Sequence, residues 1–288
     1  LSALKNSKNV LILPAQNGLR VYAPLLCLLR RLFKGRKLHY AVIGGWLPKF
    51  LPQRKILAKS LKLFNGIYAE TNTMKSALEA QGFSNVYVMP NCKKLTVLEE
   101  SDLVYPEGAP YRLCTFSRVM KEKGIETAAT VIKQVNEKLG YTAFSLDIYG
   151  QVDAQQTQWF ENLKNTFPGY IRYLGCIDSG KSVEVLKNYF ALIFPTRFYT
   201  EGIPGTIIDA YSAGIPVISA QWESYSDVVD EGETGVGYGF NNEKHFEEIL
   251  LNAAKNPRIL LDMKKTCINK AKNYTPEKAT RIMVENFE

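Results

Sequence analysis

The sequence predicts an α/β protein with two Rossmann-like domains, each built around a parallel sheet. The chain has 288 residues, which is more than one domain usually contains. Short apolar segments alternate with segments of helical periodicity, as in parallel sheets that helices cover on both faces. The charge is also divided, because residues 1–100 carry 16 basic and four acidic side chains although the whole chain has a net charge of +8. We therefore expect the two halves of the chain to form separate domains that differ in net charge.

The N-terminal half contains four apolar segments that read as buried strands, with helical segments between them. We expect strands at 9–13, 38–43, 66–69 and 86–89, and helices near 21–33, 52–63 and 72–81. A polar stretch with several prolines covers residues 91–110. Because such composition is typical of linkers, we place the end of the first domain at residue 105.

Residues 106–274 show a more regular alternation and are expected to form the second domain. We expect strands at 112–116, 144–149, 171–174, 191–194 and 216–219, and helices near 124–138, 154–166, 180–188, 204–213, 242–255 and 257–272. Residues 275–288 are expected to form a helix that packs back on the N-terminal domain. Ligands of such sheets bind beyond the carboxyl ends of the strands, so the loops after these strands are the candidate binding region.

The segment 194–218 has the strongest functional signal. An apolar strand leads into a loop with Glu201, and Gly202 and Gly205 precede or open a helix that contains Asp209. Glycine lets the backbone approach a ligand, and the free N–H groups at a helix start favour phosphate. The two acids suit hydroxyl groups better than phosphate, so the pattern indicates a nucleotide sugar. The alternative interpretation is an ordinary buried strand, loop and helix.

A second segment precedes the first by about eighty residues. Ser117 and Arg118 follow an apolar strand, and Lys123 and Gly124 open the next helix. Fixed cations at this place would stabilise negative charge that develops on a leaving phosphate. A basic pair at a strand end is more often a solvated loop, but its place at the start of the same domain favours a shared site.

These two segments resemble the E-x7-E and G-R-x4-K-G motifs of retaining glycosyltransferases with the GT-B fold, in particular glycosyltransferase family 4. Here the first motif is E-x7-D, and Ser117 replaces the usual glycine of the second. The resemblance covers about residues 65–275. The N-terminal half resembles only the second part of the family's acceptor domain, so it is expected to lack that domain's first strands. A truncated chain, a disordered start or a partner chain would each explain this.

The resemblance also implies roles for single residues. Arg118 and Lys123 would hold the pyrophosphate, Glu201 would contact the transferred sugar, and Asp209 would hold the ribose. The other expected donor contacts are Ser117, Gly150, Gly202, Ile203, Pro204, Gly205 and Thr206, most of them through the backbone. In the family, loops such as those with Gly150 and Gly175 surround the nucleobase.

The resemblance implies a retaining, metal-independent hexosyltransferase of polysaccharide biosynthesis. It would move a sugar from a nucleoside-diphosphate sugar, with UDP or GDP, to a glycan or lipid-linked acceptor, and the leaving phosphate would help to deprotonate that acceptor. The sequence has no D-x-D or H-E-x-x-H motif, and its five cysteines lack short spacings, so we expect no metal site and no cofactor. The alternatives are a sugar-nucleotide epimerase or hydrolase of the same fold, and a basic nucleic-acid-binding module.

The cellular location is inferred from cysteine usage and from the basic N-terminal half. Scattered cysteines indicate reduced thiols, and no run of eighteen apolar residues is present, so we expect a cytoplasmic protein without a membrane span. Basic residues and leucines crowd the stretch 25–62. This composition suits peripheral contact with an anionic membrane at its inner face, although leucines in the core and solvated charges would explain it equally well. No nucleic-acid partner is expected.

Overall fold

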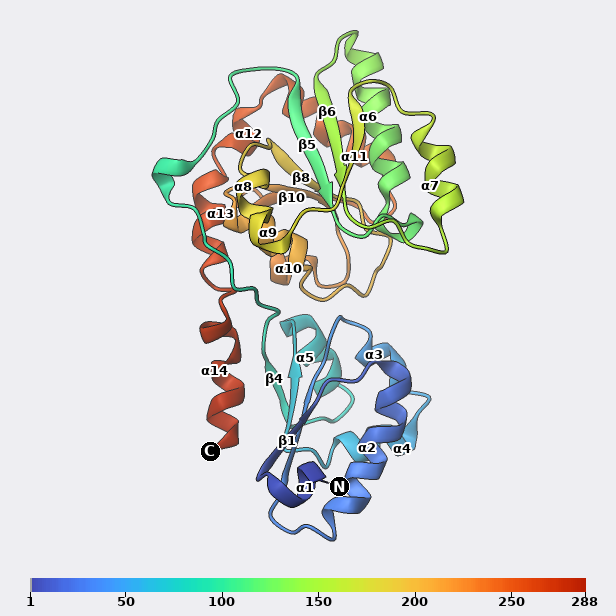
Figure 1. Ribbon diagram of the computed structural model, residues 1–288, viewed down its shortest axis with the longest axis vertical. Helices are drawn as coiled ribbons and strands as arrows, with labels where there is room; N and C mark the ends of the chain where they lie inside the picture. Colours follow the sequence, from blue (N-terminus) through green and yellow to red (C-terminus); the bar gives the residue numbers. More distant parts are fainter. Residues whose placement is uncertain (1) are drawn as a thin grey trace. The chain divides into compact units, whose positions relative to one another are not determined.

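The computed structural model describes residues 2–288 and divides them into two compact units (Figure 1). Unit 1 contains the described residues up to Cys92, together with Thr200–Ile203 and Pro276–Glu288, and unit 2 contains Lys93–Tyr199 and Pro204–Thr275. Each unit has one sheet, and all of its strand pairs are parallel.

The units divide the predicted linker earlier than residue 105. The N–H of Lys93 donates to the carbonyl oxygen of Tyr274 at 3.1 Å, and the N–H of Leu98 donates to that of Ser212 at 2.9 Å. These bonds attach the polar stretch to unit 2, so the first unit ends at Cys92. Composition identifies a polar segment but cannot tell to which domain its backbone will bond.

Unit 1 has a four-stranded sheet of order β1-β2-β3-β4. Its strands are β1 (Asn9–Ile12), β2 (Lys37–Ala41), β3 (Gly66–Ala69) and β4 (Val86–Val88). Its helices are α1 (Ser2–Asn6), α2 (Gln16–Arg30), α3 (Leu47–Phe50), α4 (Lys55–Leu61), α5 (Asn72–Glu79) and α14 (Pro276–Phe287). The four strands agree with the prediction. The helix expected near 52–63 is shorter and corresponds to α4, whereas α3, which precedes it, was not predicted. Pro52 lies between these two helices, where it lacks the N–H that would continue a helix.

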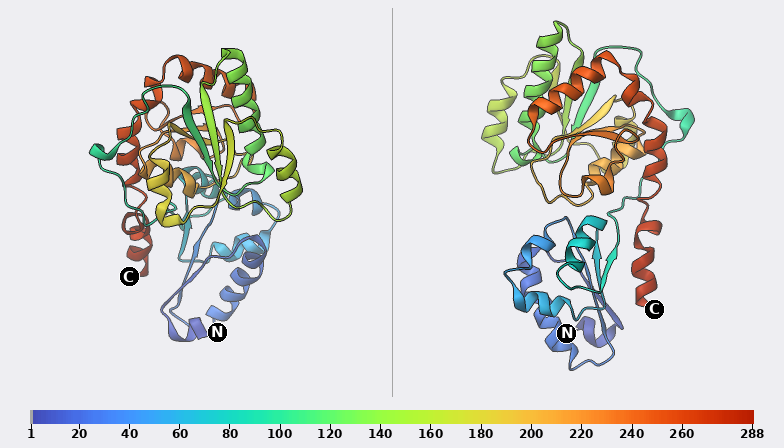
Figure 2. Two further views of the ribbon diagram at one scale, coloured as in Figure 1. Left: turned by 45° about the horizontal axis from the view of Figure 1, so that its top comes forward. Right: turned by 180° about the vertical axis from the view of Figure 1, so that it is seen from behind.

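The two faces of this sheet meet different helices. Alternate residues such as Leu38 and Tyr40 join the core on which α2 and α4 pack, while α14 lies on the other side (Figures 1 and 2). On that side the His39 ring lies 4.6 Å from the Phe287 ring, and its Nδ1 is 3.0 Å from the Tyr68 hydroxyl. Desolvation, with a smaller effect of the Lys37 charge, lowers the His39 pKa to about 4. His39 is therefore a neutral core residue at pH 7.

Unit 2 has a six-stranded sheet of order β10-β9-β8-β5-β6-β7. Its strands are β5 (Tyr111–Phe116), β6 (Phe144–Tyr149), β7 (Ile171–Gly175), β8 (Ala191–Phe194), β9 (Val217–Ala220) and β10 (Gly235–Tyr238). Its α-helices are α6 (Ile125–Leu139), α7 (Thr157–Lys164), α8 (Ser182–Leu186), α9 (Gly205–Ser212), α10 (Tyr225–Val228), α11 (Glu243–Lys255), α12 (Arg258–Leu261) and α13 (Lys264–Ala271). Strand β10 and helix α10 were not predicted, and the helix expected at 257–272 is divided into α12 and α13.

The direction of the chain across this sheet reverses beside β5. The chain runs from β5 to β6 and β7 in one direction, and from β8 to β9 and β10 in the other. Since crossovers are right-handed, the reversal places α6 with α11 on one face and α9 with α8 and α13 on the other (Figures 1 and 2). Carboxyl ends of strands at such a reversal are where open α/β sheets bind ligands.

A buried lysine in unit 2 makes stability depend on pH. Lys264 is fully buried, and its Nζ donates to the carbonyl oxygens of Gly214 at 3.2 Å and Tyr189 at 3.4 Å. Desolvation lowers its pKa to about 8, whereas an unfolded lysine titrates near 10.4. Between these pH values the unfolded chain holds a proton that the folded chain has lost, so this site stabilises the fold increasingly as pH rises.

We expect Lys264→Met to remove this dependence. The free energy of unfolding of the variant minus that of the wild type should fall by about 2–4 kcal/mol between pH 7.5 and 10.5, because the wild type alone loses its buried charge. Urea unfolding at several pH values measures the difference, in which other titrating groups largely cancel. Lys265→Met, at an exposed ion pair with Glu100, is the control. A difference that does not change with pH would contradict the lowered pKa of Lys264.

Candidate functional site

The loops after β5 and β6 meet at the carboxyl edge of the unit 2 sheet. A Cβ added to Gly150 would lie 1.8 Å from the carbonyl oxygen of Ser117, and Gly150 has a φ of +133°, so only glycine fits there. Arg118 follows directly, with 65% of its side chain exposed and NH1 3.9 Å from Asp153. The guanidinium is therefore accessible to a ligand at this edge.

One pocket joins the two glycine-containing loops that were predicted to surround a nucleobase. It has a volume of about 200 Å³ and is lined by Phe116, Ser117, Tyr149, Gly150, Gln151, Cys176 and Ile177. The aromatic rings of Phe116 and Tyr149 lie 5.8 Å apart. Aromatic and backbone walls of this kind suit a flat ring.

Lys123 lies where the loop after β5 touches the end of β8. Gly124 has a φ of +70°, and an added Cβ would be 1.9 Å from the carbonyl oxygen of Pro195. The Lys123 ammonium lies 5.1 Å from the centre of the Phe198 ring and 5.6 Å from that of Phe194. Aromatic faces attract a cation, so these rings hold the lysine at the carboxyl edge.

Helix α9 begins without a side-chain cap. Its N-cap is Pro204, and the N–H groups of Gly205 and Thr206 belong to the first turn, which has no intrahelical acceptors. The Thr206 Oγ1 is buried and has no hydrogen-bond partner within residues 2–288. Free N–H groups and the helix dipole make this start suitable for an anion.

Asp209 lies one turn further along α9 and already has two protein partners. It is 2% exposed. Its Oδ1 accepts a hydrogen bond from Ser182 Oγ at 2.8 Å, and its Oδ2 pairs with Lys93 Nζ at 2.6 Å. Lys93 is 29% exposed, so the polar group that reaches solvent here is the ammonium rather than the carboxylate.

Glu201 belongs to a segment that unit 1 holds. The segment Thr200–Ile203 is part of unit 1, although the residues on either side of it in the chain belong to unit 2. Glu70, at the end of β3, accepts a hydrogen bond from the N–H of Ile203 at 2.7 Å and another from that of Gly44 at 2.9 Å. One oxygen of this carboxylate therefore fixes the loop that carries Glu201, and the other fixes the loop after β2.

Glycines let this loop and the loop after β2 approach the Glu70 carboxylate closely. A Cβ added to Gly202 would lie 1.9 Å from Glu70 Oε2, and Gly44 has a φ of +76°. Burial raises the pKa of Glu70 and the nearby charge of Glu201 adds to this effect, while the two N–H groups oppose it. Sequence reasoning did not identify Glu70, although it is the first acidic residue of the chain and follows a buried strand.

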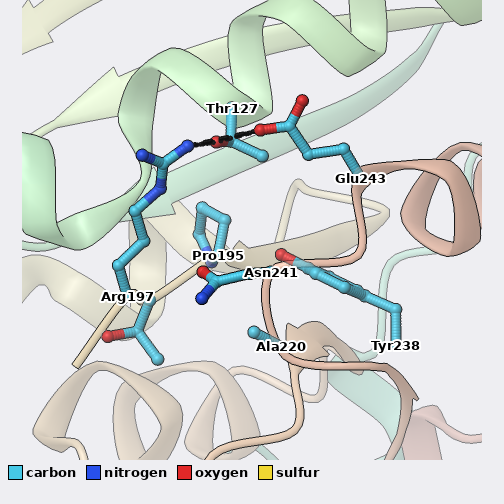
Figure 3. A pocket seen from close by; sticks show the side chains of 8 residues that line it. Thr127, Pro195, Arg197, Ala220, Tyr238, Asn241 and Glu243 are labelled. Atoms are coloured by element: carbon cyan, nitrogen blue, oxygen red, sulfur yellow. Dashed lines mark hydrogen bonds and ion pairs between the residues drawn. The ribbon is translucent and has the colours of Figure 1, made fainter. Parts of the chain in front are cut away.

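A further pocket of about 300 Å³ lies at the carboxyl ends of β8, β9 and β10 (Figure 3). The Arg197 guanidinium points toward Thr127 Oγ1 at 2.7 Å and Glu243 Oε1 at 3.3 Å (Figure 3). The charged groups that line this pocket, Arg197 and Glu243, thus bind one another. We interpret this network as support for the loop after β8, which leads to Glu201.

The described residues offer neither a cluster of metal ligands nor a membrane-spanning helix. Within residues 2–288, no group of three or more His, Cys, Asp or Glu side chains is arranged to hold a metal ion. Over the same range, no helix combines the length and the apolar composition that crossing a membrane requires.

The sequence was compared with known protein families and curated proteins. A family model described as "Glycosyl transferases group 1" matches residues 110–256, a range that includes Arg118, Lys123, Glu201 and Asp209. Alpha-galactosylglucosyldiacylglycerol synthase of Streptococcus pneumoniae is 23% identical over 173 residues, which are 59% of this chain and 44% of that protein. The chain thus spans less than half the length of this relative.

The similarity to solved structures extends over more of the chain than the similarity to the curated sequence does. Anabaena HepE in complex with UDP superposes with a TM-score of 0.79 at 14% identity, over 99% of this chain and 79% of HepE. The lipopolysaccharide outer core galactosyltransferase WaaB gives 0.73 at 16% identity, over 99% and 76%. A mutant of S. aureus TarM, in complex with fondaparinux, alpha-GlcNAc-glycerol and UDP, gives a TM-score of 0.71 at 14% identity, over 89% of this chain and 52% of that chain. At these identities the likeness shows a common fold.

Proposed function

Because the chain belongs to the group 1 glycosyl transferases and has the GT-B fold, we propose that it moves a sugar from a nucleoside-diphosphate sugar to a glycan or lipid-linked acceptor. One observation carries this proposal. Arg118, Lys123 and the uncapped start of α9 belong to the carboxyl edge of one sheet, next to the reversal of strand order. Two cations with free backbone N–H groups suit a diphosphate.

Each part of the donor has a proposed place. The nucleobase occupies the pocket between Tyr149 and Ile177, and the ribose lies beside Asp209 and Lys93. The N–H groups of Gly205 and Thr206 bind phosphate. HepE and TarM bind UDP, so we propose UDP rather than GDP as the nucleotide.

Transfer is proposed to retain configuration and to need no metal ion. The bond between the anomeric carbon and the phosphate oxygen breaks, and the acceptor oxygen attacks the same face. The acceptor's proton passes to the leaving phosphate. Arg118 and Lys123 stabilise the charge on that phosphate, as fixed cations can in place of a metal. Glu201 positions the sugar, which we take to be a hexose.

A sugar-nucleotide epimerase or hydrolase of the same fold remains the competing function. It would need groups in unit 1 that exchange protons with the substrate. Glu70 is a poor candidate, because both of its oxygens accept hydrogen bonds from backbone N–H groups. This arrangement favours the transferase.

A thermal-shift screen tests the proposed function. UDP, GDP and their sugars should be compared, since a ligand at about 100 times its Kd adds about 2.7 kcal/mol to stability. A short RNA serves as the comparison for nucleic-acid binding. The proposal fails if RNA raises the melting temperature and no nucleotide or nucleotide sugar does. With an active donor, NMR of the product determines the anomeric configuration, and added EDTA tests metal dependence.

Glu70→Gln should lower kcat because it loosens the loop that carries Glu201. The amide has only one acceptor oxygen, so one of the two backbone N–H groups loses its partner, at a cost of about 1–3 kcal/mol. We expect a fall in kcat of about tenfold to a hundredfold, with little change in the KM for the donor. Glu79→Gln, at an exposed pair with Lys75, is the control.

The melting temperature of both variants separates positioning from folding. Positioning by Glu70 predicts that kcat falls in Glu70→Gln at temperatures where the variant is fully folded. Equal kcat in the wild type and Glu70→Gln would show that the loop does not depend on this carboxylate.

A further inference from the structure

Helix α2 has apolar side chains on two opposite faces. Its inner face packs into the unit 1 core through buried Leu19 and Ala23 and through the partly buried Leu26. The outer face carries four exposed apolar residues at intervals of four, three and four, which place them along one line. They are Val21 (60% exposed), Leu25 (43%), Leu28 (60%) and, in the turn after the helix, Leu32 (75%). We call these four residues the outer stripe.

The apolar side chains in and next to α2, α3 and α4 fall into two sets, one buried in or packed on the core and one exposed. Many of those that composition assigned to a membrane contact are core residues or pack on the core, namely Leu26, Leu29, Phe33, Phe50, Leu51, Leu57 and Leu61. The outer stripe and Ile56, which is 75% exposed, are not. The core therefore explains the first set and leaves the second without a partner.

Basic side chains lie on one flank of the outer stripe, on the side where α2 packs against α4. They line two surface hollows, which also contain apolar residues. One hollow, of about 490 Å³, includes Arg30, Arg31, Lys34 and Leu63, and the other, of about 540 Å³, includes Arg20, Arg54, Lys55 and Ile56. The first acidic residue of the sequence is Glu70, so no carboxylate from the preceding segment offsets this charge.

We propose that the outer stripe and these basic residues form a docking surface for an anionic phospholipid membrane. Exposed apolar residues beside Lys and Arg are the composition of helices that lie in a membrane interface. The stripe covers eleven residue steps, or about 16 Å, which is too short to cross a bilayer, so α2 lies parallel to the surface. A second copy of this chain would bring the same positive charge against itself, whereas anionic lipid complements it.

This surface goes beyond the proposed function, because it requires no catalysis. If the acceptor is lipid-linked, the surface would also bring the enzyme to its substrate. Membrane binding can be measured without donor or acceptor, so a failure of the transferase assay and a failure of membrane binding are separate results.

Co-sedimentation of the whole chain with vesicles tests the proposal. Vesicles of phosphatidylcholine alone are compared with vesicles that also contain phosphatidylglycerol, at low and at high salt. We expect binding to the anionic vesicles that salt reverses, since each basic residue near the surface strengthens binding about fivefold at low ionic strength. Absence of binding to anionic vesicles at low salt overturns the proposal.

A pair of charge-matched variants tests the stripe itself. Leu28→Glu with Leu32→Glu should weaken binding by about tenfold or more, because it removes apolar contact and also adds negative charge. Tyr141→Glu with Val284→Glu changes exposed residues elsewhere (52% and 53%) by the same charge and should change binding far less. Equal losses in both variants would mean that net charge alone binds the vesicles, and would overturn the docking surface.

A second measurement does not depend on the stability of the glutamate variants. Leu32→Trp should show a blue shift of its fluorescence with anionic vesicles, whereas Val284→Trp should not. The alternative that a second copy of the chain covers the outer stripe is tested separately. Light scattering of the protein without vesicles measures its mass and so shows whether it is a dimer. A dimer that the Leu28→Glu, Leu32→Glu variant dissociates would assign the stripe to self-association and overturn membrane docking.

Discussion

Replacing Arg118 or Lys123 with alanine is expected to lower kcat by about 30-fold to 1,000-fold, which is about 2–4 kcal/mol of transition-state stabilisation for each residue. Charge accumulates on the leaving phosphate as the sugar–phosphate bond breaks. Fixed cations therefore bind the transition state more strongly than the donor, and most of the loss should be in kcat rather than KM. Steady-state kinetics with the donor identified by thermal shift measures both constants.

Lys121 provides a matched control for these variants. It is in the same short turn as Lys123 but is exposed, with its ammonium 5.8 Å from the Trp159 ring. Lys121→Ala should leave kcat nearly unchanged. If Arg118→Ala and Lys123→Ala behave like Lys121→Ala, the two cations do not serve the leaving group and the assignment is wrong.

Most strands could be predicted from the sequence because a buried parallel strand is itself a short apolar segment. Segments such as Ala191–Phe194 are short, apolar and bounded by turn residues, and all four residues of this strand are buried. Strand β10 (Gly235–Tyr238) was missed because two of its four residues are glycines, which weaken the signal of a strand. Its pairing with β9 supplies what its composition lacks.

The candidate site was predictable only where its residues follow strands in the chain. Arg118 and Gly150 end neighbouring strands, and parallel sheets bring such ends together. Lys93 does not follow a strand directly, and Glu70 follows β3 but has its partner far along the chain. Glu70 binds Ile203, 133 residues away, and Lys93 binds Asp209, 116 residues away. Contacts between residues so distant in the sequence depend on the folded chain and leave no local pattern.

The roles of the two acids of the E-x7-D segment should separate in binding experiments. Glu201→Gln is expected to reduce transfer severely while it leaves the affinity for bare UDP nearly unchanged, because Glu201 is assigned to the sugar. Asp209→Ala is expected to weaken bare UDP by about 1–3 kcal/mol, the usual range for a lost hydrogen bond to a charged group. Calorimetry with UDP and a transfer assay measure these effects.

The contacts of Asp209 decide how its variant is interpreted. Its carboxylate is buried against Ser182 and Lys93, so Asp209→Ala also releases the Lys93 ammonium from its partner. Lys93→Met keeps Asp209 and removes the cation, and it should weaken UDP to a similar extent if the pair acts together. Glu100→Ala, which breaks the exposed pair with Lys265, controls for the loss of any ion pair. Loss of UDP affinity in Glu201→Gln but not in Asp209→Ala would show that Glu201, rather than Asp209, contacts the nucleotide. Unchanged UDP affinity and transfer activity in both variants would show that neither residue belongs to the donor site.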